Sequence, residues 1–128
     1  MSIRVVRLGS ERAAHEGLRI GTVRRPPRGV PKERYAIENW FDVWLPDLAP
    51  SQELVKAAQG AATPRAWQGF ARKYRVEMAR PENRRLLRLL AALSQQTNLA
   101  VGCYCADEAR CHRSILRELL AECGAELR

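Results

Sequence analysis

The spacing of apolar residues along the chain alternates between strand-like runs and helical periodicity. A run rich in β-branched residues, from Ile3 to Leu8, ends at Gly9-Ser10 and predicts a first strand. Leu18–Val23 predicts a second strand. A third apolar run, Leu99–Cys105, follows the turn residues Thr97-Asn98 and predicts a buried strand.

Segments with helical spacing separate these strands. Ser51 predicts the N-cap of a short helix that ends at Gly60, and Thr63-Pro64 predicts the start of a second, amphipathic helix. A third helix is expected from Pro81. Its predicted apolar stripe consists of Leu86, Leu89, Leu90 and Leu93.

A final helix is predicted to begin at Ser114, as its N-cap, and to end at Gly124. Because strands alternate with helices, the sequence predicts an α/β fold with a short, mostly parallel sheet flanked by helices. The chain has 128 residues, of which 46% are hydrophobic, so we expect a single small domain spanning residues 1–128.

Two segments depart from this pattern. Arg24–Lys32 contains three prolines and a glycine, which predicts a stiff, cationic loop. Asn39–Pro46 holds three of the eight aromatic residues, and we expect it to pack into the core.

Membrane and export signals are missing from the sequence. No stretch approaches the ~18 uncharged apolar residues that a membrane span needs, and the first residues lack a signal-peptide core. We therefore expect a cytoplasmic protein without a membrane partner.

The charge is strongly positive and unevenly distributed. Lys and Arg total 22 against 14 Asp and Glu, a net charge of +8, and 19 of the 22 cations are arginine. Residues 1–34 and 65–91 each carry +6, whereas residues 35–64 carry −3 and residues 92–128 carry −1. Guanidinium groups bind phosphate in a bidentate manner, so an anionic small molecule, a nucleotide or a nucleic acid is an expected partner. A solvated, arginine-rich surface is the alternative.

Three of the four cysteines and one of the two histidines lie between Cys103 and His112. In a reducing compartment such a cluster indicates metal or thiol chemistry before structural disulfides. Cys103, Cys105, Cys111 and His112 form a sulfur and imidazole set suited to zinc, and on an ideal strand Cys103 and Cys105 face the same side. The spacing differs from the two separated knuckles of most structural zinc sites.

A catalytic thiol is the other hypothesis for this cluster. The start of the last helix, together with Arg110 and Arg113, would favour a thiolate on Cys105 or Cys111, with His112 as the base. Free N–H groups at the helix start would bind an anion. The spacing from Cys105 to either arginine does not match the phosphatase loop, so we do not predict phosphotyrosine hydrolysis.

A purely structural role is the third interpretation of these residues. It is the preferred one for Cys123, which lies on the leucine face of the last helix. For Cys103 a structural and a functional role are equally supported, whereas Cys105, Cys111, His112 and Arg113 favour function. His15 receives no role.

Three motifs together resemble a known family. They are Cys105-x5-Cys111-His112-Arg113, the segment Thr22–Gly29 and the segment Trp44–Ser51. Their order and spacing resemble the domain of unknown function 488 family, especially its YeaO-like branch. The resemblance implies a small bacterial or archaeal cytosolic α/β domain and carries no established reaction.

The family's Cys-His-Arg motif matches Cys111, His112 and Arg113 of this chain, and its Pro-Arg-Gly motif matches Pro27–Gly29. Many YeaO-like members have Asp-Arg-x-Trp-Pro-Arg-Gly where this chain reads Val23–Gly29, without the Asp and the Trp. Some members also lack the cysteines, which argues against an obligatory metal across the family.

The leading functional hypothesis is an enzyme-like pocket at the carboxyl ends of the strands, where open α/β sheets bind ligands. Arg24, Arg25, Arg28 and Gly29 would bind an anionic ligand there. Cys105, Cys111, His112 and Arg113 would supply the chemistry. One alternative is a non-catalytic nucleic-acid-binding module whose phosphate contacts come from residues 65–91 and from the loop Arg24–Lys32. The other is a zinc-stabilised interaction domain.

Overall fold

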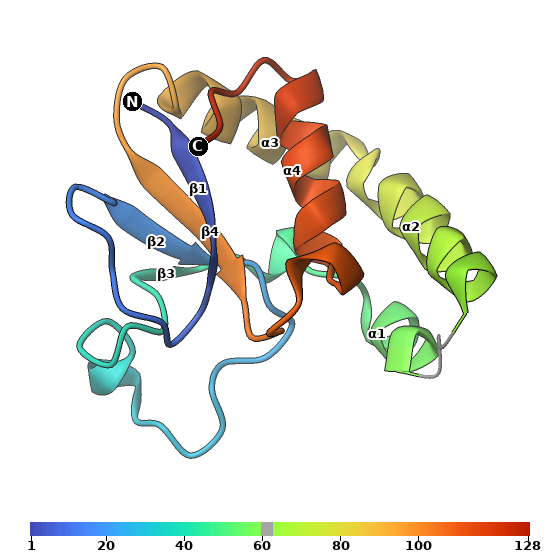
Figure 1. The fold of residues 1–128 in the computed structure, drawn as a ribbon, viewed down its shortest axis with the longest axis horizontal. Helices are drawn as coiled ribbons and strands as arrows, with labels where there is room; N and C mark the ends of the chain where they lie inside the picture. Colours follow the sequence, from blue (N-terminus) through green and yellow to red (C-terminus); the bar gives the residue numbers. More distant parts are fainter. Residues whose placement is uncertain (60–62) are drawn as a thin grey trace.

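The fold is built on a parallel sheet in which the last strand along the chain lies between the first two (Figure 1). A computed structural model describes residues 1–59 and 63–128. Its strands are β1 (Ile3–Arg7), β2 (Leu18–Gly21), β3 (Val43–Trp44) and β4 (Leu99–Cys103). They lie in the order β1-β4-β2-β3, and every pairing is parallel. The carboxyl ends of β1, β4 and β2 therefore meet at one edge of the sheet.

Helices fill the connection from β3 to β4 and follow β4. They are α1 (Gln52–Gln59), α2 (Pro64–Met78), α3 (Pro81–Leu93) and α4 (His112–Glu122). The predicted caps are present, because the hydroxyls of Ser51 and Thr63 each accept a backbone N–H from the first turn of their helix. Gly60, the expected end of α1, lies outside the described residues. Gly124, with φ of +88°, follows the end of α4.

The start of α4 differs from the prediction. The helix begins at His112, and Cys111 occupies the N-cap with an extended backbone. Ser114 lies in the first turn, where its hydroxyl donates to the Cys111 carbonyl (2.9 Å), so it is not the cap. The earlier start places His112 and Arg113 at the amino end of the helix.

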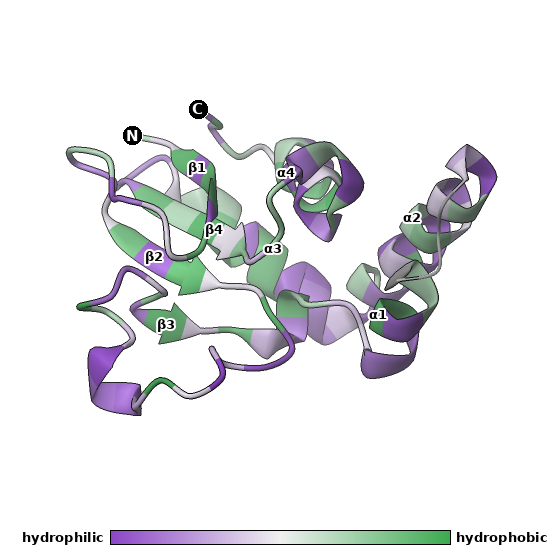
Figure 2. Cartoon of the chain, turned by 60° about the horizontal axis from the view of Figure 1, so that its bottom comes forward, coloured by the Kyte–Doolittle hydropathy of each residue, from purple (hydrophilic) through white to green (hydrophobic). Residues whose placement is uncertain are grey.

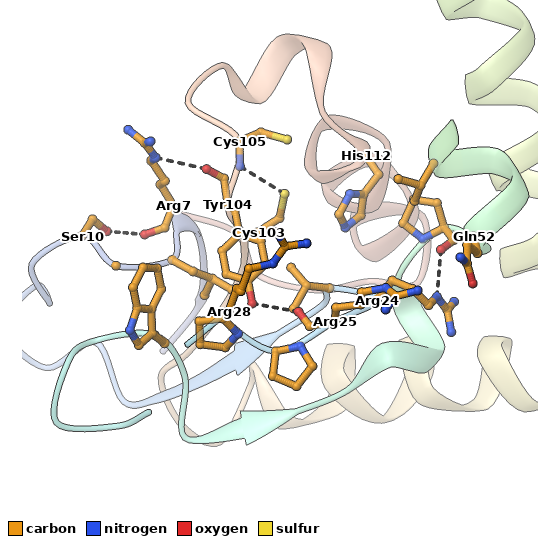
Figure 3. Close-up of a pocket in the computed structure, with 18 of the residues that line it drawn as sticks. Arg7, Ser10, Arg24, Arg25, Arg28, Gln52, Cys103, Tyr104, Cys105 and His112 are labelled. Carbon is orange, nitrogen blue, oxygen red and sulfur yellow. Dashed lines mark hydrogen bonds between the residues drawn. The ribbon is translucent and has the colours of Figure 1, made fainter. Parts of the chain in front are cut away.

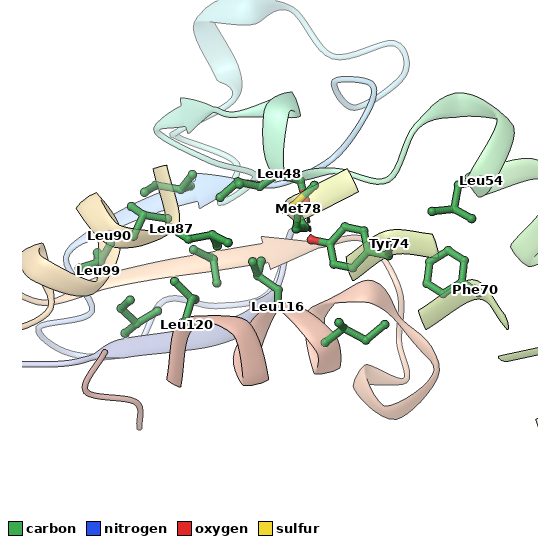
Figure 4. Packing of buried hydrophobic residues seen from close by; sticks show 14 residues of the cluster. Leu48, Leu54, Phe70, Tyr74, Met78, Leu87, Leu90, Leu99, Leu116 and Leu120 are labelled. Carbon is green, nitrogen blue, oxygen red and sulfur yellow. Dashed lines mark hydrogen bonds between the residues drawn. The ribbon is translucent and has the colours of Figure 1, made fainter. Parts of the chain in front are cut away.

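The helices cover one face of the sheet and bury the main core there (Figure 4). Leu99 and Val101 of β4 point into this core, as do residues from each of the α-helices α1 to α4. The stripe predicted for α3 was partly wrong, because Leu87 and Leu90 are buried whereas Leu89 is 54% exposed. The cause is an excess of leucine in α3, which leaves two faces of the helix apolar by pattern alone.

Loop segments cover the opposite face of the sheet, around a buried ion pair. The Arg19 guanidinium is fully buried and binds Glu16 at 2.8 Å. It also donates to the carbonyl oxygens of Ser10 and Asn39 (2.9 and 2.8 Å). Burial raises the pKa of Glu16, but the contacts with Arg19 outweigh it and hold that pKa below its ordinary value. Arg19, on β2, thus joins the segment that follows β1 to the segment that precedes β3.

The aromatic segment is only partly in the core. Phe41 is buried against Gly21, where a larger residue would overlap its ring. Trp44 is 43% exposed, which contradicts the expected core position. It lies in β3, a two-residue edge strand that the sequence did not predict, and its indole N–H donates to the Val23 carbonyl (2.7 Å).

The α/β fold class is confirmed: the chain forms a single small domain with a parallel sheet and flanking helices. Figure 2 shows that the short 3-10 helix Lys32–Arg34, in the segment between β2 and β3, is strongly hydrophilic. Among the described residues, none of the helices combines the length and apolarity that a bilayer crossing requires.

Candidate functional site

The cysteine-rich segment connects the end of β4 to the start of α4. β4 ends at Cys103, and a short 3-10 helix, Glu108–Arg110, precedes α4. Cys105 therefore lies beyond the strand, where the expected same-face relation with Cys103 does not apply. Cys103 is buried and Cys105 is exposed.

Two buried thiols lie in contact beneath this segment. The Sγ atoms of Cys103 and Cys111 are 3.1 Å apart, and the backbone N–H of Cys105 donates to Cys103 Sγ at 3.4 Å. Cys111 Sγ is also 3.7 Å from Nδ1 of His112. Cysteines eight residues apart thus meet because the chain turns back between β4 and α4.

The imidazole of His112 is fixed by the end of β2. Nε2 of His112 lies 2.8 Å from the carbonyl oxygen of Thr22. A carbonyl only accepts, so Nε2 carries a hydrogen and Nδ1 presents its lone pair to Cys111 in the neutral ring. The ring also packs edge-on against Tyr74, with 5.5 Å between ring centroids. The geometry makes His112 able to accept the thiol proton of Cys111.

Electrostatics separate the three thiols. Hydrogen bonding to the neighbouring sulfurs of Cys105 and Cys111 raises the pKa of Cys103 above its ordinary range. Hydrogen bonding with Cys103, and next with Cys111, lowers the pKa of Cys105 to about 3, and the positive charge of Arg113 contributes less. The pKa of Cys111 is also lowered, chiefly by Cys103 and then by His112. These directions favour the protonated form of Cys103 and the thiolate form of the exposed Cys105.

Arg113 supports the segment from inside. Its side chain is buried, and Nη2 donates to the carbonyl oxygen of Cys105 at 2.6 Å. Its Nε has no hydrogen-bond partner among the described residues. Arg113 therefore fixes the backbone of Cys105 and places a buried positive charge near its thiol.

A cavity of about 980 Å³ opens at the carboxyl ends of β1, β4 and β2 (Figure 3). The predicted site residues that line it are Arg24, Arg25, Arg28, Cys103, Cys105 and His112. Arg24 is anchored, because its guanidinium donates to the carbonyl oxygens of Ala49 and Pro50, each at 3.1 Å. Tyr104 also anchors the cationic loop Arg24–Lys32, because its hydroxyl donates to the Arg25 carbonyl oxygen (2.8 Å). The loop after β2 thus faces the cysteine segment across the cavity.

The charge around the cavity has one sign. The basic lining residues are Arg7, Arg24, Arg25, Arg28 and Lys56. None of them forms an ion pair with a carboxylate of residues 1–59 or 63–128, and the lining includes no acidic residue from those ranges. Uncompensated guanidinium and ammonium groups in a cavity attract an anionic ligand.

The chain matches the family described as Active DUF488-N3 subclade over residues 3–124. It belongs to the DUF488 family. This confirms the family indicated by the motifs, whereas the YeaO-like branch stays a prediction. No curated protein and no solved structure matches the chain.

Within the described part of this DUF488 chain, one group of residues is able to hold a metal ion. The donor atoms of Cys103, Cys111 and His112 all lie within 4.8 Å of one another. Cys105, the fourth predicted ligand, is not part of this group. The hydrogen bond from Nε2 of His112 to a backbone carbonyl is the outer-shell contact that metal-binding histidines usually make.

Three predicted site residues do not reach the cavity of this DUF488 chain. Cys111 lies behind Cys103, Arg113 is buried under the segment, and Gly29 is absent from the lining. The basic region 65–91 also gives the cavity no lining residue. Sequence reasoning missed the lining residues Arg7, Trp40, Gln52, Lys56 and Tyr104. Arg7 and Tyr104 had a usable signal, since each lies at or just after a strand end, whereas Lys56 had none.

Proposed function

We propose that this DUF488 chain is an enzyme that binds a phosphate-bearing ligand, a nucleotide or a nucleic acid, and acts on it with a cysteine thiolate. The observation that carries the proposal is the shared cavity. Arg24, Arg25 and Arg28 line it together with Cys103, Cys105 and His112, although about 75 residues separate the two segments along the chain. The family description calls the subclade active, which also supports an enzymatic role.

Cys105 is the proposed nucleophile. It is the exposed thiol of the cluster, it lines the cavity, and its pKa is lowered to about 3. A thiolate is the reactive form of cysteine, and a positively charged neighbour favours it. Cys111 and His112 form a buried thiol and imidazole pair behind it that can exchange a proton with Cys103.

The proposal is tested first by anion binding. Titration of the protein with pyrophosphate in a calorimeter should show saturable binding, and Arg25→Gln and Arg28→Gln should each weaken it about tenfold. Arg88→Gln is the matched control, because Arg88 is an exposed arginine on α3 that does not line the cavity. Equal binding by all three variants and the wild type would refute an anion site in this cavity.

Catalysis is tested separately from binding. Cys105→Ser should keep the pyrophosphate affinity and abolish covalent capture of an electrophilic nucleotide analogue, as measured by intact-protein mass. A non-catalytic nucleic-acid-binding module, the alternative from the charge distribution, would show no capture in the wild type either.

A zinc site is the second candidate function, and the closeness of Cys103, Cys111 and His112 favours it. Two thiolates and one imidazole leave a tetrahedral ion one position for a ligand, and Cys103 and His112 both line the cavity. Protein purified without chelator should then contain close to one zinc per chain. Cys111→Ser should lose the zinc, whereas Cys105→Ser should keep it, because Cys105 lies outside the group. Metal-free wild-type protein would rule this candidate out.

A further inference from the structure

The positive charges of the cavity are contributed by separate elements. Arg7 lies at the end of β1, Arg25 and Arg28 lie in the loop after β2, and Lys56 lies on α1. Figure 3 shows Arg7, Arg28 and Arg24 on successive parts of the wall. A single phosphate group is small enough to be bound by one or two of these side chains. Cations spread over the wall fit a ligand that carries several phosphates.

An aromatic side chain forms the part of the wall next to Gly9 and Ser10. Trp40 lines the cavity and packs edge-on against Tyr104, with 5.9 Å between ring centroids. Its indole N–H donates to Glu38 at 3.3 Å. A Cβ on Gly9 would lie 2.8 Å from the Trp40 ring, so the glycine allows the backbone to support it closely. Trp40 is therefore an aromatic wall held in place before any ligand binds.

The remaining wall is suited to flat, apolar groups. Val23, Pro26, Pro27 and Val55 also line the cavity. Positively charged grooves that combine backbone contacts with aromatic stacking are the general solution for single-stranded nucleic acid. In a duplex the bases are stacked inside, where a side chain such as Trp40 cannot stack on them without unpairing. The cavity volume of about 980 Å³ is at the upper end of the range of about 300–1,000 Å³ for single small ligands.

We propose that the ligand of this cavity is a single-stranded nucleic acid, with one base stacked on Trp40 and successive phosphates bound by Arg7, Arg28 and Arg24. The inference rests on the proposed function, which it narrows from phosphate-bearing ligands in general to one class. Cys105 lines the same cavity, so its thiol belongs to the wall of the proposed binding site.

The test is fluorescence anisotropy with a labelled oligothymidylate of about 12 nucleotides and the intact protein. The oligomer should bind at least tenfold more tightly than thymidine monophosphate or pyrophosphate, which serve as competitors. A duplex of the same length should bind more weakly than the single strand. Affinity should fall with salt, and Arg28→Gln should reduce the slope by about 0.7, the value for one phosphate contact on a single strand.

Two tryptophans provide a matched pair of variants. Trp40→Ala should weaken binding at least fivefold, because stacking on one base is lost. Trp44→Ala should leave it unchanged, since Trp44 is exposed and does not line the cavity. If Trp40→Ala fails to fold, a variant with Trp44 and Trp67 both changed to Phe reports on Trp40 alone. The oligomer should quench its fluorescence, as expected for a stacked base.

The outcomes separate this inference from the proposed function. Pyrophosphate or mononucleotide binding that matches the oligomer, with no effect of Trp40→Ala and no quenching, would overturn the single-strand assignment and leave the anion site intact. Equal affinity for duplex and single strand would also overturn it. Absence of binding to pyrophosphate, mononucleotide and oligomer alike would remove both.

Discussion

At the scale of single residues, the Thr22 carbonyl determines which nitrogen of His112 faces the thiols. It accepts from Nε2, and the Thr22 hydroxyl donates to the Gly102 carbonyl at 3.0 Å, which anchors the threonine to β4. The lone pair of Nδ1 is thereby directed at Cys111. Thr22, the residue directly after β2, thus orients His112 so that Nδ1 can accept the thiol proton of Cys111.

The thiol of Cys105 gives a prediction in pH. Because its pKa lies at about 3, far below the ordinary value of ~8.5, the thiolate persists as the pH falls and is protonated only near pH 3. With EDTA present, the rate of alkylation by iodoacetamide should change by less than about twofold between pH 8 and 5.5. An ordinary cysteine slows by more than about 100-fold over that range. Site-resolved mass spectrometry measures the rate at Cys105.

The control for this measurement is the same protein unfolded in urea, where Cys105 should return to ordinary pH dependence. A steep pH dependence of Cys105 in the folded protein would show that Cys103 and Arg113 do not stabilise the thiolate.

At the scale of elements, the starts of β2 and β4 are joined through Gly17 and Asn98. Gly17 has φ of +85°, and a Cβ there would overlap the carbonyl group of Asn98. The Asn98 side chain donates to the His15 carbonyl (2.8 Å) and accepts from the Ser2 N–H (3.1 Å). The glycine therefore permits the close approach that sets β2 in register beside β4.

Gly17→Ala should destabilise the protein by at least about 2 kcal/mol, since both the left-handed backbone and the clash oppose alanine. Gly29→Ala is the matched control, because Gly29 has φ of +75° but nothing within 4 Å of the added Cβ. Gly29→Ala should lower the free energy of unfolding by about 1 kcal/mol, because only the left-handed backbone opposes alanine there. Urea unfolding measures both. Equal losses would show that the contact with Asn98 has no energetic weight.

At the scale of the whole molecule, local signals predicted the elements better than they predicted the site. The hydroxyl caps Ser51 and Thr63 correctly predicted the starts of α1 and α2, since a cap depends only on the next three residues. The faces of α3 were less well predicted, because its leucines satisfy two helical stripes and only the packed sheet selects one. β3 has two residues, too few for a periodic pattern.

The site depends on strand order, which no local pattern contains. Insertion of β4 between β1 and β2 brings Arg7, Cys103 and Thr22 to one edge of the sheet. The motif Cys111-His112-Arg113 was visible in the sequence, but the burial of Cys111 and Arg113 was not. Lys56 entered the cavity through the placement of α1, a long-range consequence that composition could not indicate.

The position of β4 also orders the folding of the chain in time. β1 has β4 as its ladder partner, and β4 begins more than 90 residues after β1. During synthesis, β1 and β2 emerge long before β4, so the edges of β1 and β2 that face β4 stay unpaired until residues 99–103 appear, whereas the other edge of β2 pairs with β3. Closing so large a loop is entropically costly and slows folding. Cys103 is the last residue of β4, and Cys111 and His112 follow it along the chain, so the thiol cluster can assemble only after β4 has entered the sheet.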